Sequence, residues 1–167
     1  MKTQVFSLLV NDNAGLLSRV AGLFSRRGYN IDSITSGNTM SQGITRITVV
    51  ATGDEQILSQ IEKQLAKLED VLEIKILKDG ASVCRELIMV KIKADASQRT
   101  EVISLADIFR AKIVDVETDS LMLEMTGNKS KVEAFLKLLS GYEILELART
   151  GITGLSRGSD GVFDTEA

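Results

Sequence analysis

The sequence predicts an α+β protein made of two tandem units, each with the order strand, helix, strand, strand, helix, strand. Two observations support this prediction. Apolar residues alternate between a spacing of two, typical of half-buried strands, and a spacing of three to four, typical of amphipathic helices. The same succession of six elements then occurs twice in 167 residues, on either side of a short stretch at 78–82. A βαββαβ order predicts a ferredoxin-like unit, a four-stranded antiparallel sheet with both helices on one face.

The first unit is expected at residues 1–78. Its first strand places Phe6, Leu8 and Val10 on one face, and the apolar stripe of the following helix stops at Gly28, a residue typical of helix ends. In order, the expected elements are a strand at 4–10, a helix carrying Leu16, Leu17, Val20, Leu23 and Phe24, strands at 31–36 and 44–51, a helix carrying Ile57, Ile61, Leu65 and Leu68, and a strand at 71–77.

The second unit is expected at residues 83–150 and repeats the pattern rather than the letters of the first. In order, its elements are a strand at 86–93, a helix carrying Val102, Leu105, Ile108 and Phe109, strands at 112–116 and 121–125, a helix carrying Val132, Phe135, Leu136 and Leu139, and a strand at 143–148. One sheet face per unit lacks a helix layer, which favours dimers formed through sheet faces or edges. Residues 151–167 are expected to form a mobile tail, with a partner-docking peptide as the alternative.

Composition indicates a globular protein and excludes several functions. Hydrophobic residues make up 44% and charged residues 26% of the chain, unlike disordered sequences. The net charge of −3 and the pI of about 5.1 provide no basic surface for nucleic acid or an anionic membrane. No apolar run approaches the roughly 20 residues that span a bilayer. The single cysteine, Cys84, allows no internal disulfide. We therefore expect a cytoplasmic protein with no nucleic-acid or membrane partner.

The residue types that common catalytic and metal sites require are missing. The chain has no histidine, which excludes His-based acid–base catalysis and His metal ligands. It has no cysteine pair for zinc and no GxxxxGK[ST] or GxGxxG phosphate loop. An RNA-binding sheet would need exposed aromatic residues among positive charges, whereas the chain has only five Phe and two Tyr and is acidic. We expect no catalytic residues, no metal site and no RNA site.

One short stretch invites a functional interpretation. Four residues, Asp12 to Gly15, separate the first strand from the first helix. Their Asn and Asp side chains could simply cap the free amides of the first helical turn. Alternatively, those amides and the helix dipole could bind a carboxylate, with Gly15 allowing close approach and an Asp or Asn side chain accepting from an ammonium group. Leu16 and Leu17 beside the turn would favour an aliphatic side chain, so the second interpretation predicts a site for a free amino acid.

Three blocks resemble one known family. VNDNAGLLSRVAGLFSRRGYNIDSI, from Val10, is similar to the start of the ACT domain in the regulatory (small) subunits of acetolactate synthase, also called acetohydroxyacid synthase. RELIMVKI, from Arg85, and ARTGITGLSRG, from Ala148, agree with the same family, as does QIEKQLAKLEDVLEI at 60–74. The resemblance covers nearly the whole chain and implies an N-terminal ACT domain followed by a C-terminal ACT-like domain.

The resemblance also implies effector-binding residues. The family's effector loop falls on Asp12, Asn13, Ala14, Gly15, Leu16 and Leu17, and its Gly-aromatic-Asn motif falls on Gly28, Tyr29 and Asn30, with Ile31 following. Two positions depart from the family: Asp12 stands where Asn is usual, and Ala14 where Pro is frequent. Asp12 can accept from a ligand ammonium but cannot donate to a carboxylate, and Ala14 fixes the loop less than Pro would. Residues 94–98 replace the loop in the second unit, so we expect the effector site in the first unit only.

Such a subunit has no active site and binds no cofactor of its own. The resemblance implies that it binds the catalytic (large) subunit of acetolactate synthase, which holds thiamine diphosphate, Mg and FAD. It further implies that the chain raises the activity of that subunit, confers feedback inhibition by valine in branched-chain amino acid biosynthesis, and forms a homodimer through its ACT domains. The alternative is a free-standing ACT-type amino-acid sensor that regulates another enzyme.

Overall fold

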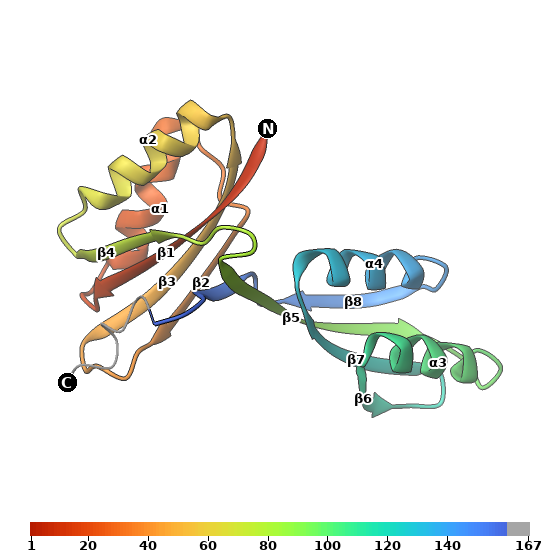
Figure 1. The fold of residues 1–167 in the computed structure, drawn as a ribbon. Helices are drawn as coiled ribbons and strands as arrows, with labels where there is room; N and C mark the ends of the chain where they lie inside the picture. Colours follow the sequence, from red (N-terminus) through yellow and green to blue (C-terminus); the bar gives the residue numbers. More distant parts are fainter. Residues whose placement is uncertain (160–167) are drawn as a thin grey trace. The chain divides into compact units, whose positions relative to one another are not determined.

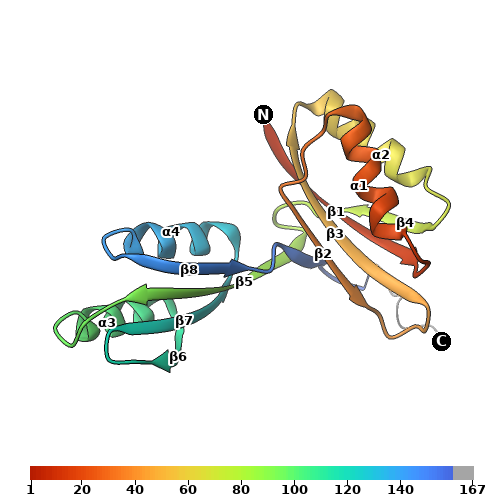
Figure 2. The same ribbon diagram turned by 180° about the vertical axis from the view of Figure 1, so that it is seen from behind.

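The structure, a computed structural model, describes residues 1–159 and divides into two compact units (Figure 1). The first unit holds Met1–Cys84 and the segment that begins at Ile152, and the second holds Arg85–Gly151. Each unit contains an antiparallel sheet with two helices on one face, as Figure 2 shows from behind. The predicted fold class, two βαββαβ units, is confirmed.

The first sheet has the strand order β2-β3-β1-β4. Its elements are β1 (Lys2–Asn11), α1 (Leu16–Arg27), β2 (Ser33–Asn38), β3 (Ile44–Gly53), α2 (Glu55–Ala66) and β4 (Val71–Ile76). The side chain of Asp54 caps α2 by accepting from the Ile57 amide, and Gly28 ends α1 in a left-handed conformation. Phe6 of β1 lies opposite Val49 of β3, and both are fully buried against the helices.

The other face of the first sheet is also covered in part. The register places Ser7 and Leu9 of β1 on this face, and both side chains are buried although no helix lies over them. The backbone carbonyl of Ile152 accepts from the Thr35 hydroxyl at 3.4 Å, and its amide donates to the Ser33 hydroxyl at 3.5 Å. Figure 1 shows this C-terminal segment, in blue, crossing the sheet on the side away from α1 and α2. The chain therefore supplies some of the cover that the sequence suggested a second copy would supply.

The second sheet has the order β6-β7-β5-β8. Its elements are β5 (Ser82–Lys93), α3 (Arg99–Phe109), β6 (Lys112–Val116), β7 (Ser120–Gly127), α4 (Lys129–Leu139) and β8 (Ile144–Arg149). Glu86 is 4% exposed and accepts from Nε and Nη2 of Arg149, each at 2.8 Å. This two-bond pair satisfies a carboxylate that would otherwise be buried without a partner.

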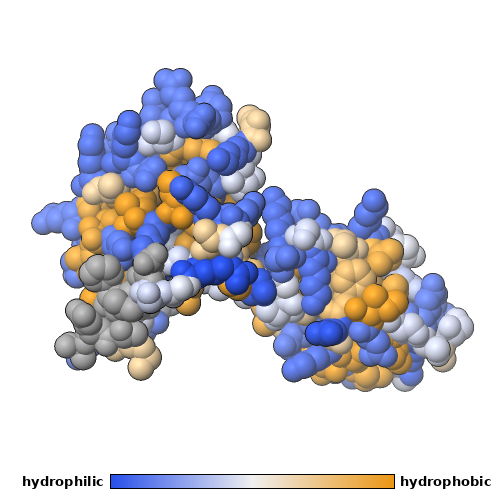
Figure 3. Space-filling model, viewed as in Figure 1, coloured by the Kyte–Doolittle hydropathy of each residue, from blue (hydrophilic) through white to orange (hydrophobic). Residues whose placement is uncertain are grey.

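The second unit also has an apolar open edge. Within residues 1–159, β8 pairs with β5 alone, and its Ile144, Leu145 and Leu147 side chains are all at least 40% exposed. Figure 3 shows orange, hydrophobic surface on this unit. An open strand edge with exposed apolar side chains is a typical association surface. It agrees with the general expectation of dimers formed through sheet faces or edges, while the homodimer expected through the ACT domains stays a prediction.

The segment expected as a mobile tail from residue 151 begins instead with a strand, β9 (Thr153–Ser156), which pairs with β5. A Cβ on Gly154 would lie 2.6 Å from Sγ of Cys84 and 2.7 Å from the carbonyl oxygen of Val83. Glycine thus permits the close approach of the two strands. The pairing joins residues about 70 positions apart, which a local sequence pattern cannot reveal. The rest of the expected tail, residues 160–167, lies outside the described residues.

The contact at Gly154 predicts a stability effect. We expect Gly154→Ala to lower the free energy of unfolding by about 1–3 kcal/mol, because the new methyl group overlaps backbone that cannot move freely. Gly141→Ala is the matched control, since a Cβ at Gly141 would meet nothing within 4 Å, and it should stay within about 0.5 kcal/mol of the unmutated protein. Urea unfolding measures both, and equal stability of the two variants would contradict the close packing of β9.

Candidate functional site

The loop between β1 and α1 leaves helix amides unoccupied. Gly15 stands at the helix N-cap with a φ of 81°, a left-handed conformation, and makes no side-chain capping bond. The first bonds of α1 run from the Leu16 amide to the Asn13 carbonyl and from the Arg19 amide to the Gly15 carbonyl. Among the described residues, the amides of Leu17 and Ser18 have no acceptor. The interpretation of the loop as an Asn or Asp cap is therefore wrong, and the free amides match what a carboxylate site requires.

Asp12 and Asn13 have different roles in this loop. The Asp12 amide donates to the Gly43 carbonyl at 2.8 Å, which fixes the backbone, while its carboxylate is exposed and has no partner in residues 1–159. The Asn13 side chain is engaged, because its Nδ2 donates to Oδ1 of Asp70 at 2.6 Å. Asp12 is thus available to a ligand ammonium, whereas Asn13 holds the loop to the start of β4.

Asp70 and Arg19 lie beside the candidate site and were not predicted. Arg19 donates to Oδ2 of Asp70 from Nε at 2.9 Å and from Nη2 at 2.6 Å, and its Nη1 donates to the Ala14 carbonyl at 3.2 Å. Asp70 is 8% exposed. A hollow of about 400 Å³ adjoins the pair, lined by Asn11, Asn13, Arg19, Leu68, Glu69 and Asp70. Arg19 lies inside the resembling block, but no local pattern links it to a residue 51 positions away.

The environment of Asp70 predicts a pH effect on stability. The hydrogen bond from Asn13, then that from Arg19, lowers the pKa of the Asp70 carboxyl below its ordinary 3.8. A carboxyl whose pKa is lower in the folded than in the unfolded state stabilises the fold at pH values above its unfolded-state pKa. This stabilisation is lost as the pH falls through the folded-state pKa. We expect Asp70→Asn to lower Tm at pH 7 and the difference from the unmutated protein to shrink below about pH 4.

Thermal unfolding between pH 3 and pH 7, followed by circular dichroism, checks this expectation. Asp12→Asn is the control, since the exposed Asp12 carboxylate makes no hydrogen bond or ion pair with another described residue and its replacement should change Tm little. A Tm difference for Asp70→Asn that stays constant across this range would show that its charge makes no special contribution to the fold.

The structure brings together six of the eight expected site residues. Asp12 to Leu17 form one continuous loop and helix start; Leu16 is 5% exposed and packs in the core, whereas Leu17 is 49% exposed. Asn30 and Ile31 follow the other end of α1, whose 12 residues span about 18 Å. The exposed Asn30 donates to Asp32 at 3.5 Å, and Ile31 packs against the core. A single free amino acid cannot touch both groups within one chain.

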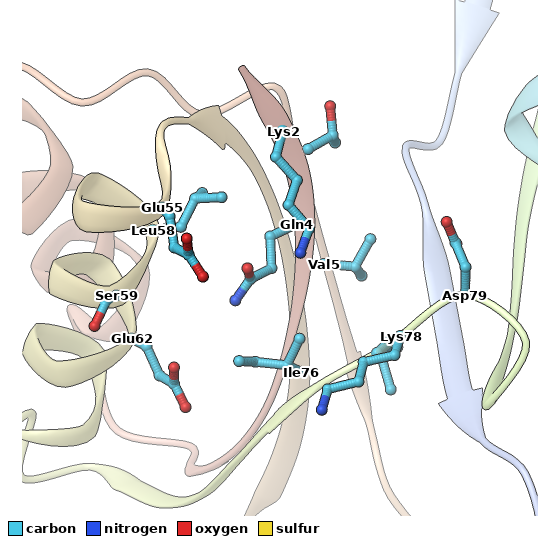
Figure 4. A pocket seen from close by; sticks show the side chains of 12 residues that line it. Lys2, Gln4, Val5, Glu55, Leu58, Ser59, Glu62, Ile76, Lys78 and Asp79 are labelled. Atoms are coloured by element: carbon cyan, nitrogen blue, oxygen red, sulfur yellow. The ribbon is translucent and has the colours of Figure 1, made fainter.

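A second hollow, of about 510 Å³, lies away from the expected residues (Figure 4). It is found near the start of β1, whereas the effector loop follows the end of that ten-residue strand. Figure 4 shows Lys2 and Gln4 of β1, Glu55 and Glu62 of α2, and Lys78 around it. Three of these side chains are exposed and two, Gln4 and Glu62, are partly buried. None of the expected effector residues lines this hollow.

The described residues contain no group of three or more His, Cys, Asp or Glu side chains placed to hold a metal ion. No helix among them is long and apolar enough to cross a membrane.

Comparison with known proteins decides the family. Residues 6–73 match the ACT domain described as like that of the small subunit of AHAS, and residues 85–158 match the family described as the small subunit of acetolactate synthase. A probable acetolactate synthase small subunit of Methanothermobacter thermautotrophicus is 51% identical over 158 residues, which is 94% of each chain. The chain belongs to the acetolactate synthase small-subunit family.

Two further members support this assignment. The acetolactate synthase isozyme 3 small subunit of Salmonella typhimurium is 46% identical over 156 residues, covering 93% of this chain and 96% of that protein. The crystal structure of the acetolactate synthase small subunit from Thermotoga maritima superimposes with a TM-score of 0.86 at 38% identity, covering 95% of this chain and 99% of that chain. The resemblance found in the sequence is confirmed, and this chain spans nearly the full length of these small subunits.

Proposed function

We propose that this small subunit is non-catalytic, binds the catalytic subunit of acetolactate synthase, raises its activity, and makes it sensitive to feedback inhibition by valine. The turn before α1 is the feature that supports valine binding by this chain. Gly15 is left-handed there, the amides of Leu17 and Ser18 have no acceptor among residues 1–159, and the Asp12 carboxylate has no partner. These are the groups that a zwitterionic amino acid needs.

Each part of valine has a complement at this turn. The free amides and the positive end of the α1 dipole suit its carboxylate. The absence of a side chain at Gly15 lets that carboxylate approach the backbone. Asp12 can accept from the ammonium group, and the half-exposed Leu17 offers an apolar neighbour to the isopropyl group.

Catalysis in the proposed complex belongs to the large subunit. The chain has no histidine, and its carboxylates are mostly exposed or paired with cations. Thiamine diphosphate, Mg and FAD would accordingly be held by the catalytic partner, while this chain contributes contacts and the effector site. Such a complex would operate in branched-chain amino acid biosynthesis in the cytoplasm.

The effector site is proposed to be shared between two chains of a homodimer. Asn30 belongs to the expected effector residues, but it lies about 18 Å from the loop along the 12 residues of α1. If two first units pair with their α1 helices antiparallel, Asn30 of one chain approaches the loop of the other. Two-fold symmetry then creates two equivalent sites.

Reconstitution with the cognate catalytic subunit tests the proposal. The tagged small subunit should capture the catalytic subunit, raise its acetolactate synthase rate, and make that rate fall when valine is added. The alternative, an ACT-type sensor for another enzyme, predicts valine binding without capture of the catalytic subunit. Failure to capture or activate it would remove the proposed regulatory role, whatever the result for valine.

A further inference from the structure

Asp70 and its ion pair with Arg19 contact the end of β1 and two residues of the loop, Asn13 and Ala14. The Asn11 amide donates to the backbone carbonyl of Asp70 at 2.8 Å, and the Asn13 side chain donates to its carboxylate at 2.6 Å. Arg19, held by the same carboxylate, donates to the Ala14 carbonyl at 3.2 Å. The turn before β4 and the first turns of α1 thus hold the loop from two sides.

We propose that Asp70 and Arg19 are positioning residues that hold the loop in its valine-binding conformation before the ligand arrives. This inference rests on the proposed function and assigns a role to two residues outside the expected effector set. Asp70 acts entirely through Asn13, Arg19 and the Asn11 backbone, so it need not touch the ligand.

Burial makes the ion pair suitable for this role. The Asp70 side chain is 11% exposed, and its two oxygens accept three hydrogen bonds, all between 2.6 and 2.9 Å. Short bonds to a charged group are among the strongest in proteins. Removing one partner would leave a poorly solvated charge, and Arg19, whose side chain is 45% exposed, could then turn into solvent.

Apart from the ion pair, the loop is held by backbone hydrogen bonds, among them the bond from the Asp12 amide to the Gly43 carbonyl at 2.8 Å. No side chain among residues 1–159 caps the start of α1, and Gly15 can leave its left-handed conformation easily in a free loop. Position 14 is Ala, so no proline ring restricts the backbone there. An unattached loop would lose conformational entropy when valine binds, and this loss would weaken the affinity. The ion pair therefore supplies a restraint that the loop's own residues do not.

Calorimetry of the full chain with valine tests the proposal. Asp70→Asn and Arg19→Gln should each raise the Kd for valine at least about tenfold, the effect of losing bonds to a charged group. The Kd of the double variant should be no higher than that of the single variant with the higher Kd, because both changes remove the same restraint. Arg19→Lys should recover only part of the affinity, since an ammonium cannot reproduce the two-bond contact and still reach Ala14.

Asp54→Ala is the matched control for a purely structural effect. It removes the N-cap bond of α2 in the same unit and lowers the stability of that unit without touching the loop. It should leave the Kd for valine unchanged at a temperature where every variant is folded. If Asp70→Asn does not fold, Arg19→Gln alone decides, because its partly exposed side chain is easier to replace.

Three results would overturn the inference, and they differ from one another. Unchanged affinity in both single variants, with normal binding by the unmutated chain, rejects the positioning role and leaves the proposed function standing. An equal loss of affinity in Asp54→Ala shows that only the stability of the unit matters. The absence of valine binding by the unmutated chain rejects the proposed effector site and, with it, this inference.

Discussion

Gly15→Asp is expected to abolish inhibition by valine in the reconstituted holoenzyme. A Cβ at this position would lie 3.3 Å from Nη1 of Arg19, so the new carboxylate would sit beside that guanidinium and the free amides of α1. It would occupy the place proposed for the carboxylate of valine and repel it by charge. The backbone contributes as well, because a φ of 81° is unfavourable for any residue with a Cβ.

Two control variants separate these causes. Gly15→Ala adds a Cβ at the same unfavourable φ but adds no charge. It should raise the valine concentration needed for inhibition by about tenfold or less. Gly80→Asp introduces the same side chain at another left-handed glycine, with a φ of 78° and open space around its Cβ, and it should leave inhibition intact. The rate is measured against valine concentration for each holoenzyme. A normal inhibition curve for Gly15→Asp would show that the loop is only a turn.

The second large effect is expected in a mixed dimer with Gly15→Asp in one chain and Asn30→His in the other. If each site combines the loop of one chain with Asn30 of its partner, both lesions fall in one site and the other site is intact. Valine binding should then return to half of the unmutated capacity. If each chain held a complete site, both sites would carry a lesion.

Purification with two different tags isolates the mixed dimer, and calorimetry counts its sites. Each homodimeric variant serves as a control and should bind no valine. A mixed dimer that also binds no valine would contradict the shared site. The loop and Asn30, at opposite ends of the 12-residue α1, would then not form one site in the proposed way.

Much of the fold could be predicted because it follows from local periodicity. The alternation around Phe6, Leu8 and Val10 identified β1, and the helical spacing that ends at Gly28 identified α1. The candidate loop was predicted for the same reason, since its polar residues and Gly15 interrupt two apolar patterns. The family's effector motif supplied Asn30, which no spacing within one chain would have connected to the loop.

The features that were missed depend on contacts between residues far apart in the chain. Asp70 approaches Arg19 from 51 positions away, and it looks like an ordinary turn residue in the sequence. β9 is a strand through its pairing with β5, where Gly154 fits closely against Val83 and Cys84. The N-cap expectation failed for a related reason: Asn13, a plausible cap by type, donates its side-chain amide to Asp70 instead.

Calorimetric titration of the isolated protein with valine is the direct test of whether this chain carries an effector site at the start of α1. We expect saturable binding of one valine per chain by the unmutated protein and none by Gly15→Asp. The complementary groups lie around Gly15, so binding by Gly15→Asp with the same affinity as the unmutated chain would show that valine does not bind at this turn. If the unmutated protein gave no heat of binding at millimolar valine, the proposed effector site would be contradicted as well.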